Sequence, residues 1–290
     1  MKAWVKTRAR QAAGELLFRT PWPHRGGALA ILMYHAVTPG DLRDGMQMSV
    51  SASQFARQMA SLRPLDADIV PLADGVARLG QATGRLAISV VFDDGFVGVH
   101  DHACEVLAEH RIPATVFVTT EWVGRPAVPG AEPALGRPMT WGEIRSLMQS
   151  CDVTVGSHSA THAVLARLAT HDVHRELQRS RDTIADQTGR RPRQFAYPFG
   201  TYGTFDDRTR DALQASGFDI GCTTVWGRND GSANQRELRR VRVSWCDSPR
   251  EIRKSLAGCY DWYRVIQRLQ THGRQPFSTY GDAHEPRESL

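Results

Sequence analysis

The sequence predicts an α/β fold in which strands and helices alternate around a barrel. Short apolar runs with the length of strands alternate along the chain with longer stretches of helical periodicity. Reactive residues directly follow several of these runs, as expected where the carboxyl ends of barrel strands meet on one face. The 290 residues, 41% of them hydrophobic, are enough for one large core in a single domain of this kind.

Each predicted element rests on its own local pattern. The strand-like runs are residues 28–34, 86–92, 114–118, 153–157 and 195–197. The helix-like stretches are residues 53–63, 99–110, 140–149, 170–188, 206–216 and 249–269. Thr140 followed by Glu143 has the spacing of a capping box, which indicates that a helix starts there.

Residues 123–138 contain four prolines and three glycines, so we expect a loop rather than a regular element. Because this stretch follows the strand-like run 114–118, it should emerge on the face where the strands end. It would wall a groove or act as a lid there, or it would be an idle surface connection.

Two adjacent carboxylates, Asp93 and Asp94, end the run 86–92 and are followed by Gly95. Neighbouring residues of an extended chain point in opposite directions, so one carboxylate can bind a cation while the other faces a bound water. An Asp-Asp-Gly triplet on its own is more often a helix cap or a solvated turn. The triplet therefore needs a second feature to support it.

That second feature is the pair His158 and His162, which follows the run 153–157. Two imidazoles four residues apart can close on one ion, although such pairs are more often surface or core histidines. One carboxylate with two imidazoles leaves coordination positions open for water and substrate. This arrangement is typical of a hydrolytic metal site and favours an enzyme.

Two more runs end in reactive residues, His35 after 28–34 and Pro198-Phe199-Gly200 after 195–197. Taken together, residues 91–95, 158–162 and 195–200 resemble the three motifs of the polysaccharide deacetylases with a NodB-type domain, also called carbohydrate esterase family 4. Met33-Tyr34-His35 resembles the branch that modifies poly-N-acetylglucosamine and related exopolysaccharides. The resemblance covers about residues 28–265 and implies a distorted (β/α) barrel of about seven strands.

The resemblance implies a metal-dependent hydrolase that removes N-acetyl groups from an amino-sugar glycan or a lipid-linked saccharide. Asp94, His158 and His162 would hold a divalent metal, with Zn expected first and Ni or Co also compatible with this ligand set. Asp93 would take a proton from water, and the backbone N–H of Phe199 would stabilise the oxyanion. The predicted substrate-binding residues are Tyr197, Pro198 and Trp245.

Two features of the family have no counterpart in this sequence. Ala196 stands where the family often carries an Arg that orients the catalytic carboxylate, and a late Leu-x-His motif, which would supply a general acid, is missing. His35 is the substitute candidate for the acid, and a hydrogen-bonded supporting histidine is the alternative. These gaps leave two other functions open: an O-acetyl esterase or non-sugar amidase, and a non-catalytic glycan-binding or membrane-docked scaffold.

The formal net charge of +5 is concentrated at the start of the chain, where residues 1–25 carry six Lys or Arg against Glu15 alone. A helix through residues 4–18 is basic and amphipathic, so it would lie on an anionic membrane or pack as an extra helix over the barrel. Because the excess is local, nucleic acid is not indicated. We divide the chain into this basic segment (1–26), the deacetylase-like domain (27–270) and a polar tail (271–290).

No apolar run is long enough to span a membrane, and no signal-like segment is recognised. A cytoplasmic location is therefore expected, with peripheral contact at the inner membrane face as an option. The five cysteines are an odd number without a close pair. This pattern predicts reduced thiols rather than disulfides.

Overall fold

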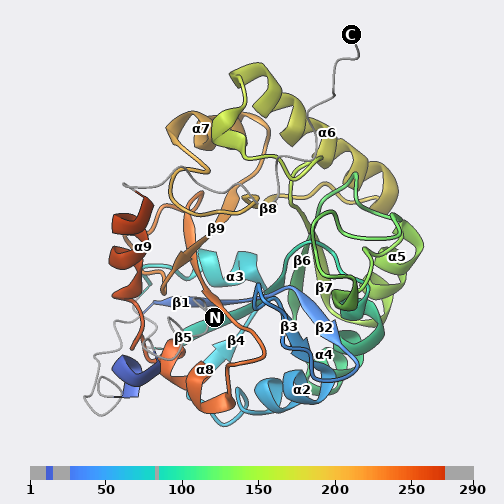
Figure 1. Ribbon diagram of the computed structural model, residues 1–290. Coiled ribbons are helices and arrows are strands. Elements are labelled where there is room, and N and C mark those ends of the chain that lie inside the picture. Colours follow the sequence, from blue (N-terminus) through green and yellow to red (C-terminus); the bar gives the residue numbers. More distant parts are fainter. Residues whose placement is uncertain (1–10, 16–26, 82–84, 272–290) are drawn as a thin grey trace.

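Seven parallel strands close into a barrel in the computed structural model, which describes residues 11–15, 27–81 and 85–271 (Figure 1). Around the barrel the order is β1 (Leu29–Tyr34), β10 (Leu238–Arg242), β9 (Ile220–Trp226), β8 (Gln194–Ala196), β7 (Val153–Ser157), β6 (Ala114–Val118) and β5 (Leu86–Phe92), and β5 pairs with β1 to close the ring. The predicted barrel of about seven strands is confirmed. The strands β9 and β10 were not among the predicted elements.

Strand β5 is the most firmly held strand of the barrel. Strand β1 pairs along its whole length, with Tyr34 opposite Phe92. On the other edge, β4 (Ala67–Ile69) pairs with its first half and β6 with its second half. All seven residues of β5 are buried. The carboxyl end of β5, where Asp93 and Asp94 follow, is therefore fixed from both sides.

Alternation along the strands decides which side chains point into the barrel. Leu29, Ile31 and Met33 of β1 belong to the interior cluster, whereas the intervening residues of that strand belong to the cluster under the outer helices. The same period of two continues in β5 and β10. Ala87 and Val91 are interior, as is Leu238. Two residues beyond Val91 and Leu238, the same alternation directs Asp93 and Arg240 toward the barrel interior.

Helices surround the barrel, except that α3 (Leu72–Ala77) lies in the middle of the ring in Figure 1, where Leu72 and Val76 join the interior cluster. The others are α2 (Ala52–Ala60), α4 (Cys104–His110), α5 (Trp141–Ser150), α6 (Thr170–Thr188), α7 (Asp207–Ala215), α8 (Pro249–Leu256) and α9 (Tyr263–Thr271). The single helix expected at 249–269 is wrong, because the chain turns between α8 and α9 at Gly258, whose φ is 83°.

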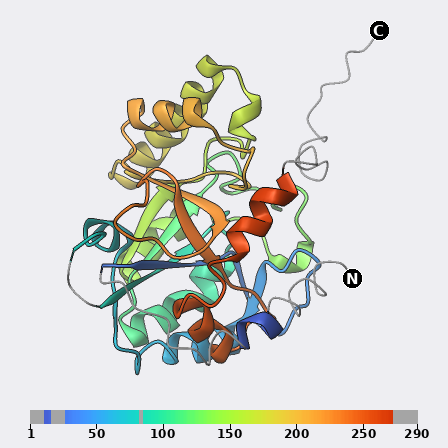
Figure 2. The same ribbon diagram turned by 90° about the vertical axis from the view of Figure 1, so that its left-hand side faces the viewer.

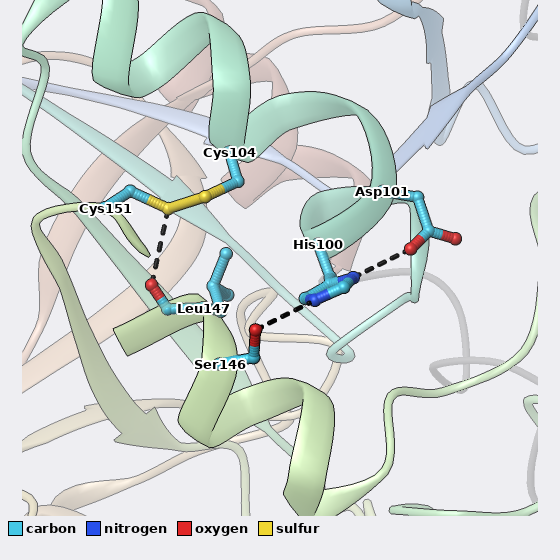
Figure 3. Close-up of a disulfide and its surroundings, with 6 residues drawn as sticks. All are labelled: His100, Asp101, Cys104, Ser146, Leu147 and Cys151. Carbon is cyan, nitrogen blue, oxygen red and sulfur yellow. Dashed lines mark hydrogen bonds and ion pairs between the residues drawn. A yellow bond between two sulfur atoms is a disulfide. The ribbon is translucent and has the colours of Figure 1, made fainter. Parts of the chain in front are cut away.

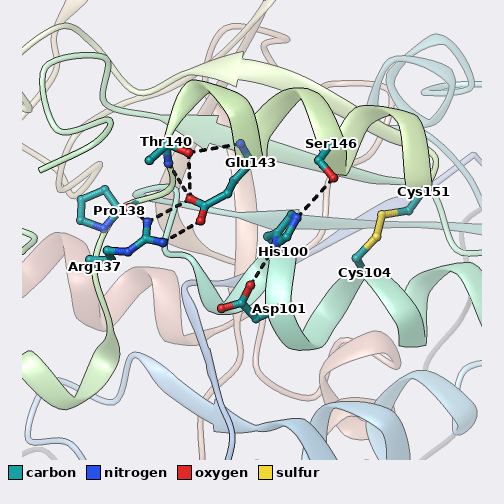
Figure 4. Close-up of polar contacts among 9 residues, drawn as sticks. All are labelled: His100, Asp101, Cys104, Arg137, Pro138, Thr140, Glu143, Ser146 and Cys151. Atoms are coloured by element: carbon teal, nitrogen blue, oxygen red, sulfur yellow. Dashed lines mark hydrogen bonds and ion pairs between the residues drawn. A yellow bond between two sulfur atoms is a disulfide. The ribbon is translucent and has the colours of Figure 1, made fainter. Parts of the chain in front are cut away.

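The predicted capping box at the start of α5 is confirmed. The Thr140 hydroxyl accepts a hydrogen bond from the Glu143 amide at 3.2 Å, and the Glu143 carboxylate accepts one from the Thr140 amide at 2.7 Å. Arg137 pairs with the same carboxylate at 2.6 Å (Figure 4). The helix start is thereby tied to the residues that precede it.

The loop expected at 123–138 is confirmed, with one 3-10 turn (Pro133–Leu135) as its regular element among the described residues. Its far end runs along the segment that follows Asp94. The amide of Met139 donates to the Gly95 carbonyl at 2.9 Å, and the amide of Val97 donates to the Arg137 carbonyl at 2.8 Å. As expected, the loop lies on the face where the strands end, beside the small sheet of β2 (Ala36–Thr38) and β3 (Ser49–Ser51), whose Ala36 packs in the same cluster.

A disulfide joins Cys104, at the start of α4, to Cys151, directly after α5 (Figure 3). Their Cα atoms are 6.0 Å apart, although the residues are separated by 47 positions in the sequence. The expectation of reduced thiols is wrong for this pair and holds for Cys222, Cys246 and Cys259. Spacing alone did not reveal the pair because the two helices meet only in the fold.

Residues 11–15 form a helical turn that packs against α8. Glu15 forms ion pairs with Arg250 at 2.5 Å and with Lys254 at 2.6 Å, and the Gln11 side chain donates to the Cys246 carbonyl at 3.1 Å. Residues 11–15 therefore agree with the alternative in which the basic segment packs as an extra helix over the barrel. The rest of that segment and residues 272–290 lie outside the described residues, so the domain boundaries stay predictions. Among the described helices, none combines the length and apolarity needed to cross a bilayer.

Candidate metal centre and its catalytic neighbours

Asp94, His158 and His162 come together at the carboxyl ends of β5 and β7. Their candidate ligand atoms all lie within 4.8 Å of one another, and Asp94 Oδ1 is 3.5 Å from the Nε2 atom of each histidine. All three side chains are nearly buried. The structure thus gathers the three residues predicted to hold a metal, and their role as ligands stays a prediction.

The backbone around the site adopts a rare conformation. Six described residues other than glycine have a positive φ, and four of them are Asp94 (68°), Ser159 (65°), His162 (65°) and Phe199 (61°). Each such residue costs on the order of 1–3 kcal/mol and persists only where the surroundings enforce it. Residues with such backbone strain cluster at active sites, so their concentration in the three motifs supports the predicted site.

The orientation of His158 suits metal binding. Its Nδ1 atom lies 2.7 Å from the Ala196 carbonyl oxygen, which can only accept a hydrogen bond. Nδ1 must therefore carry the proton, which leaves the lone pair of Nε2 directed at Asp94. Ala196, at the place of the family's Arg, thus contributes through its backbone.

His162 is held by packing and by its loop. Its ring lies 4.6 Å from the Trp122 ring and 4.8 Å from the Phe199 ring, measured between centroids. Glu176 of α6 accepts hydrogen bonds from the amides of Ala160 and Thr161, so the loop between the two histidines is fixed to a helix. The Trp122 ring that packs against this imidazole is itself buried.

The charges around Asp94 make a cation favourable. Burial and the neighbouring Asp93 raise the pKa of Asp94 to about 8. Burial lowers the pKa of His158 and His162, so both imidazoles are neutral at pH 7. A bound cation would offset the cost of ionising Asp94 and needs the neutral form of both histidines. The donor set and its protonation therefore fit a divalent metal.

Asp93 forms a buried, bidentate ion pair with Arg240 of β10. Both guanidinium nitrogens Nη1 and Nη2 lie 2.7 Å from a carboxylate oxygen, and Nε donates to the Thr223 carbonyl at 2.6 Å. Burial by itself raises the pKa of Asp93, but Arg240 outweighs it and lowers the pKa to about 2. The support expected to be missing with Ala196 is therefore supplied from another strand.

His35 follows β1 directly and lies next to Asp93 across the β1–β5 pairing. The Asp93 amide donates to the Tyr34 carbonyl at 3.0 Å, which places the two reactive residues side by side. The His35 Nδ1 atom is buried without a hydrogen-bond partner in the described part of the chain. Burial lowers the pKa of His35 to about 3 against the opposing effect of Asp93. An unpartnered ring nitrogen at this position suits contact with a substrate.

The predicted substrate residues separate into two groups. Tyr197 is wholly buried between Phe195 and Phe205, and its hydroxyl donates to the Arg236 carbonyl at 2.9 Å, so its ring supports the strand end and faces no groove. Pro198 is buried as well. Trp245 is partly exposed, and its indole N–H donates to the Asp44 carbonyl at 3.2 Å. Trp245 remains the substrate-binding candidate of the three.

Known proteins are similar to this chain in sequence and in fold. The polysaccharide deacetylase family model matches residues 80–221. The putative polysaccharide deacetylase YxkH of Bacillus subtilis (strain 168) is 23% identical over 250 residues, covering 83% of this chain and 75% of that protein. The structure of IcaB from Ammonifex degensii has a TM-score of 0.66 at 26% identity and covers 80% of this chain and 98% of its own. The Streptococcus pyogenes deacetylase PplD in complex with acetate has a TM-score of 0.67 at 18% identity, covering 80% and 99%.

The fold and site define the class first: a closed barrel of parallel strands whose mouth combines a carboxylate, two imidazoles and an ion-paired aspartate. Over residues 80–221 the chain matches the polysaccharide deacetylase family, and over most of its length it is similar to a putative polysaccharide deacetylase and to deacetylase structures. It is accordingly a hydrolase of the deacetylase type.

Proposed function

We propose that this enzyme removes N-acetyl groups from an N-acetylhexosamine of a bacterial polysaccharide or lipid-linked glycan and releases acetate. The observation that carries the proposal is the juxtaposition of two units at the barrel mouth. One is the cluster of Asp94, His158 and His162, and the other is Asp93 held by Arg240. The first unit suits a metal, and the second is an ionised carboxylate adjacent to it.

Asp94, His158 and His162 are the residues that would hold the metal. When bound, a divalent metal such as Zn, Ni or Co supplies a Lewis acid for the acetyl carbonyl and lowers the pKa of a water. The choice among these metals stays open, because all of them accept a carboxylate and two imidazoles.

Asp93 is the proposed general base. Because Arg240 keeps its pKa near 2, the carboxylate is ionised at neutral pH. Each of its oxygens accepts one guanidinium N–H, which leaves lone pairs for a proton from water. Arg240 also fixes the carboxylate in a single orientation, which favours reaction over free rotation.

His35 and Phe199 are the proposed partners of Asp93. His35 is neutral at pH 7, so it must gain a proton before it can give one to the departing amine, and its position beside Asp93 allows that transfer. The Phe199 ring packs on His162 and its backbone has a positive φ, and we propose that the N–H of this residue stabilises an oxyanion.

Trp245 is the proposed contact for the sugar ring. The Arg43 guanidinium lies 5.7 Å from its ring centroid, and Gln54 of α2 donates to its carbonyl at 2.9 Å. The ring is therefore held in place while part of it remains exposed. Sugar C–H faces pack well on such rings, which supports an exopolysaccharide or a related amino-sugar glycan as substrate.

The cellular compartment in which the enzyme works is the subject of a separate proposal. The cytoplasmic location expected from the sequence stays a prediction, and the Cys104–Cys151 disulfide argues against it, because such bonds are rare in the cytosol. We propose that the enzyme works in an oxidising compartment. Peripheral contact with an anionic membrane, expected from the basic residues in 1–25, remains compatible with this placement.

Two other functions, an O-acetyl esterase and a non-catalytic scaffold, can be distinguished from the proposed one by the substrate that is turned over. An O-acetyl esterase would release acetate from acetylated xylan and spare N-acetylglucosamine oligomers, whereas the proposed enzyme does the reverse. A non-catalytic scaffold would bind glycan without turnover. The buried Arg240–Asp93 pair weighs against the scaffold, since it replaces the support whose absence motivated that alternative.

The test is acetate release from N-acetylglucosamine oligomers by wild type and by Asp93→Asn. We expect turnover by the wild type and its loss in Asp93→Asn, with the metal retained. Full activity of Asp93→Asn would reject the proposed base.

A further inference from the structure

An apolar stripe runs along the outward face of α9. Four large hydrophobic residues are exposed in the described part of the chain, and three of them form this stripe: Trp262 (37% exposed), Val265 (55%) and Leu269 (67%). Their spacing of three and four residues places them on one side of the helix. We call these three residues the α9 stripe.

The opposite face of α9 is firmly packed on the barrel. The Gln267 side chain accepts a hydrogen bond from the Trp226 amide at 2.7 Å and donates to the Thr224 carbonyl at 3.3 Å. The ring of Tyr263 meets the Trp226 ring at a centroid distance of 6.1 Å. The helix is therefore anchored, and the exposure of the stripe follows from its orientation.

The composition of this face matches a membrane interface. Arg268 follows Val265 by three residues and lies beside the stripe, and Arg264 lies one turn before Arg268 on the flank of the helix. The Trp262 indole N–H donates to the Cys259 carbonyl at 2.9 Å, which fixes the ring at the helix start. A tryptophan, two aliphatic residues and bordering arginines are the side chains that proteins place at the boundary between lipid headgroups and acyl chains.

A described turn of the N-terminal segment, residues 11–15, lies near this face. Figure 2 shows the turn at residues 11–15 on the same side of the barrel as α9. Gly14 lies so close to the Tyr260 ring, in the α8–α9 connection, that a Cβ would overlap it. This turn belongs to the stretch 1–25, which carries six basic residues against one acidic residue. The basic residues that adjoin this turn in the sequence have the sign of charge that anionic lipid attracts.

The packed face of α9, opposite the stripe, is connected to the loop at the catalytic mouth. Thr224, which Gln267 contacts, donates from its amide to the Gly200 carbonyl at 2.8 Å and from its hydroxyl to the Phe199 carbonyl at 2.7 Å. The ring of Phe199 packs on His162. Two contacts therefore connect α9 to the loop that carries the proposed oxyanion-binding peptide.

We propose that the α9 stripe is a docking surface for an anionic lipid bilayer, which brings the barrel mouth to a glycan held at the membrane. The glycan in this statement rests on the proposed function, whereas the docking surface does not. A second copy of the chain and residues 272–290 are the competing occupants, and the experiment separates them from lipid.

The experiment measures cosedimentation of the full chain with vesicles of phosphatidylcholine alone or of phosphatidylcholine and phosphatidylglycerol in equal amounts. The wild type should sediment with the anionic vesicles. Val265→Gln/Leu269→Gln should bind them about tenfold more weakly or worse, because apolar contact is lost. Arg264→Gln/Arg268→Gln should lose a similar factor. Thermal midpoints equal to that of the wild type establish that the variants fold.

The matched control is Arg190→Gln/Arg191→Gln, which removes the same charge from two exposed residues in the α6–β8 connection. It should bind vesicles like the wild type. All variants should release acetate from soluble oligomers at the wild-type rate, so a loss of docking is read independently of catalysis. A wild type that docks but releases no acetate would reject the proposed function and leave the surface standing.

Three results would overturn the docking surface. The first is equal sedimentation of wild type and Val265→Gln/Leu269→Gln. The second is a dimer in solution that this double variant converts to a monomer, with no vesicle binding by either protein. The third is vesicle binding that appears only after residues 272–290 are removed, which would identify the tail as the occupant.

Discussion

Arg240 and Asp93 form an ion pair inside the barrel, with each carboxylate oxygen 2.7 Å from a guanidinium nitrogen and both side chains almost fully buried. The pair joins β10 to the end of β5, strands that lie far apart in the sequence and on either side of β1 in the barrel. It sets the charge and the orientation of the proposed base.

Replacing Arg240 should reduce both activity and stability. Arg240→Met leaves a buried carboxylate unpaired, which typically costs about 3–5 kcal/mol in the free energy of unfolding. Without the guanidinium, burial raises the pKa of Asp93, so the acidic limb of the kcat/KM profile should move to higher pH. Urea unfolding and a pH profile of acetate release measure the two effects.

The control for this prediction is the double variant Asp93→Asn/Arg240→Met. It should be more stable than Arg240→Met, because the unpaired carboxylate is removed. Equal stability of the two variants would show that the unpaired carboxylate carries no cost, and an unchanged pH profile in Arg240→Met would contradict the effect of Arg240 on Asp93.

A variant of a metal ligand and a variant of the base should differ in metal content. His158→Ala removes a neutral nitrogen donor, so bound metal should fall by about tenfold or more, and acetate release should fall with it. Asp93→Asn should keep its metal and lose turnover by a factor of about a hundred or more. Elemental analysis and acetate release on the same samples distinguish the two. Normal metal content in His158→Ala would exclude it as a ligand.

The Glu143 carboxylate should stabilise the fold in a defined pH range. Pairing with Arg137 lowers the pKa of Glu143 from its ordinary 4.5 to about 2 (Figure 4). Its contribution is therefore complete above pH 4.5 and is lost as the pH falls toward 2. At pH 7, Glu143→Gln should lower the free energy of unfolding by about 1 kcal/mol.

The difference between wild type and Glu143→Gln should shrink as the pH drops from 4.5 toward 2. Glu109→Gln, at an exposed position of α4, is the control and should have little effect. A destabilisation by Glu143→Gln that persists unchanged down to pH 2 would show that the carboxylate charge is not its source.

Removing the disulfide should destabilise the domain without changing the metal site. The bond closes a loop of 47 positions that includes the active-face segment 123–138. Cys104→Ser/Cys151→Ser should lower the free energy of unfolding by about 3–4 kcal/mol. Urea unfolding with and without reductant measures this, and Cys259→Ser is the control. A wild type that is insensitive to reductant and retains five titratable thiols would contradict the bond.

Strands with a clear local pattern could be predicted from the sequence alone. Strand β5 is a continuous apolar run because it is buried on all sides, and Thr140 with Glu143 marks a helix start through contacts within one turn. The candidate ligands were found for the same reason, since each directly follows such a run.

Arg240 was missed because its meaning depends on distant residues. It stands in Leu238–Arg242, where three arginines suggest an exposed segment. Only closure of the barrel puts Arg240 inside, opposite Asp93. Cys104 and Cys151 were missed similarly, because two helices bring them together. A period of two, with Leu238, Arg240 and Arg242 on one side, was the available signal for the strand.

The central claim is that Asp94, His158 and His162 hold a metal on which deacetylation depends. The most direct measurement is metal content and acetate release on one preparation, before chelation, after chelation and after metal is added back. We expect about one divalent ion per chain, loss of acetate release with loss of the ion, and recovery of both on readdition. Acetate release that persists after the metal has been removed would contradict this claim.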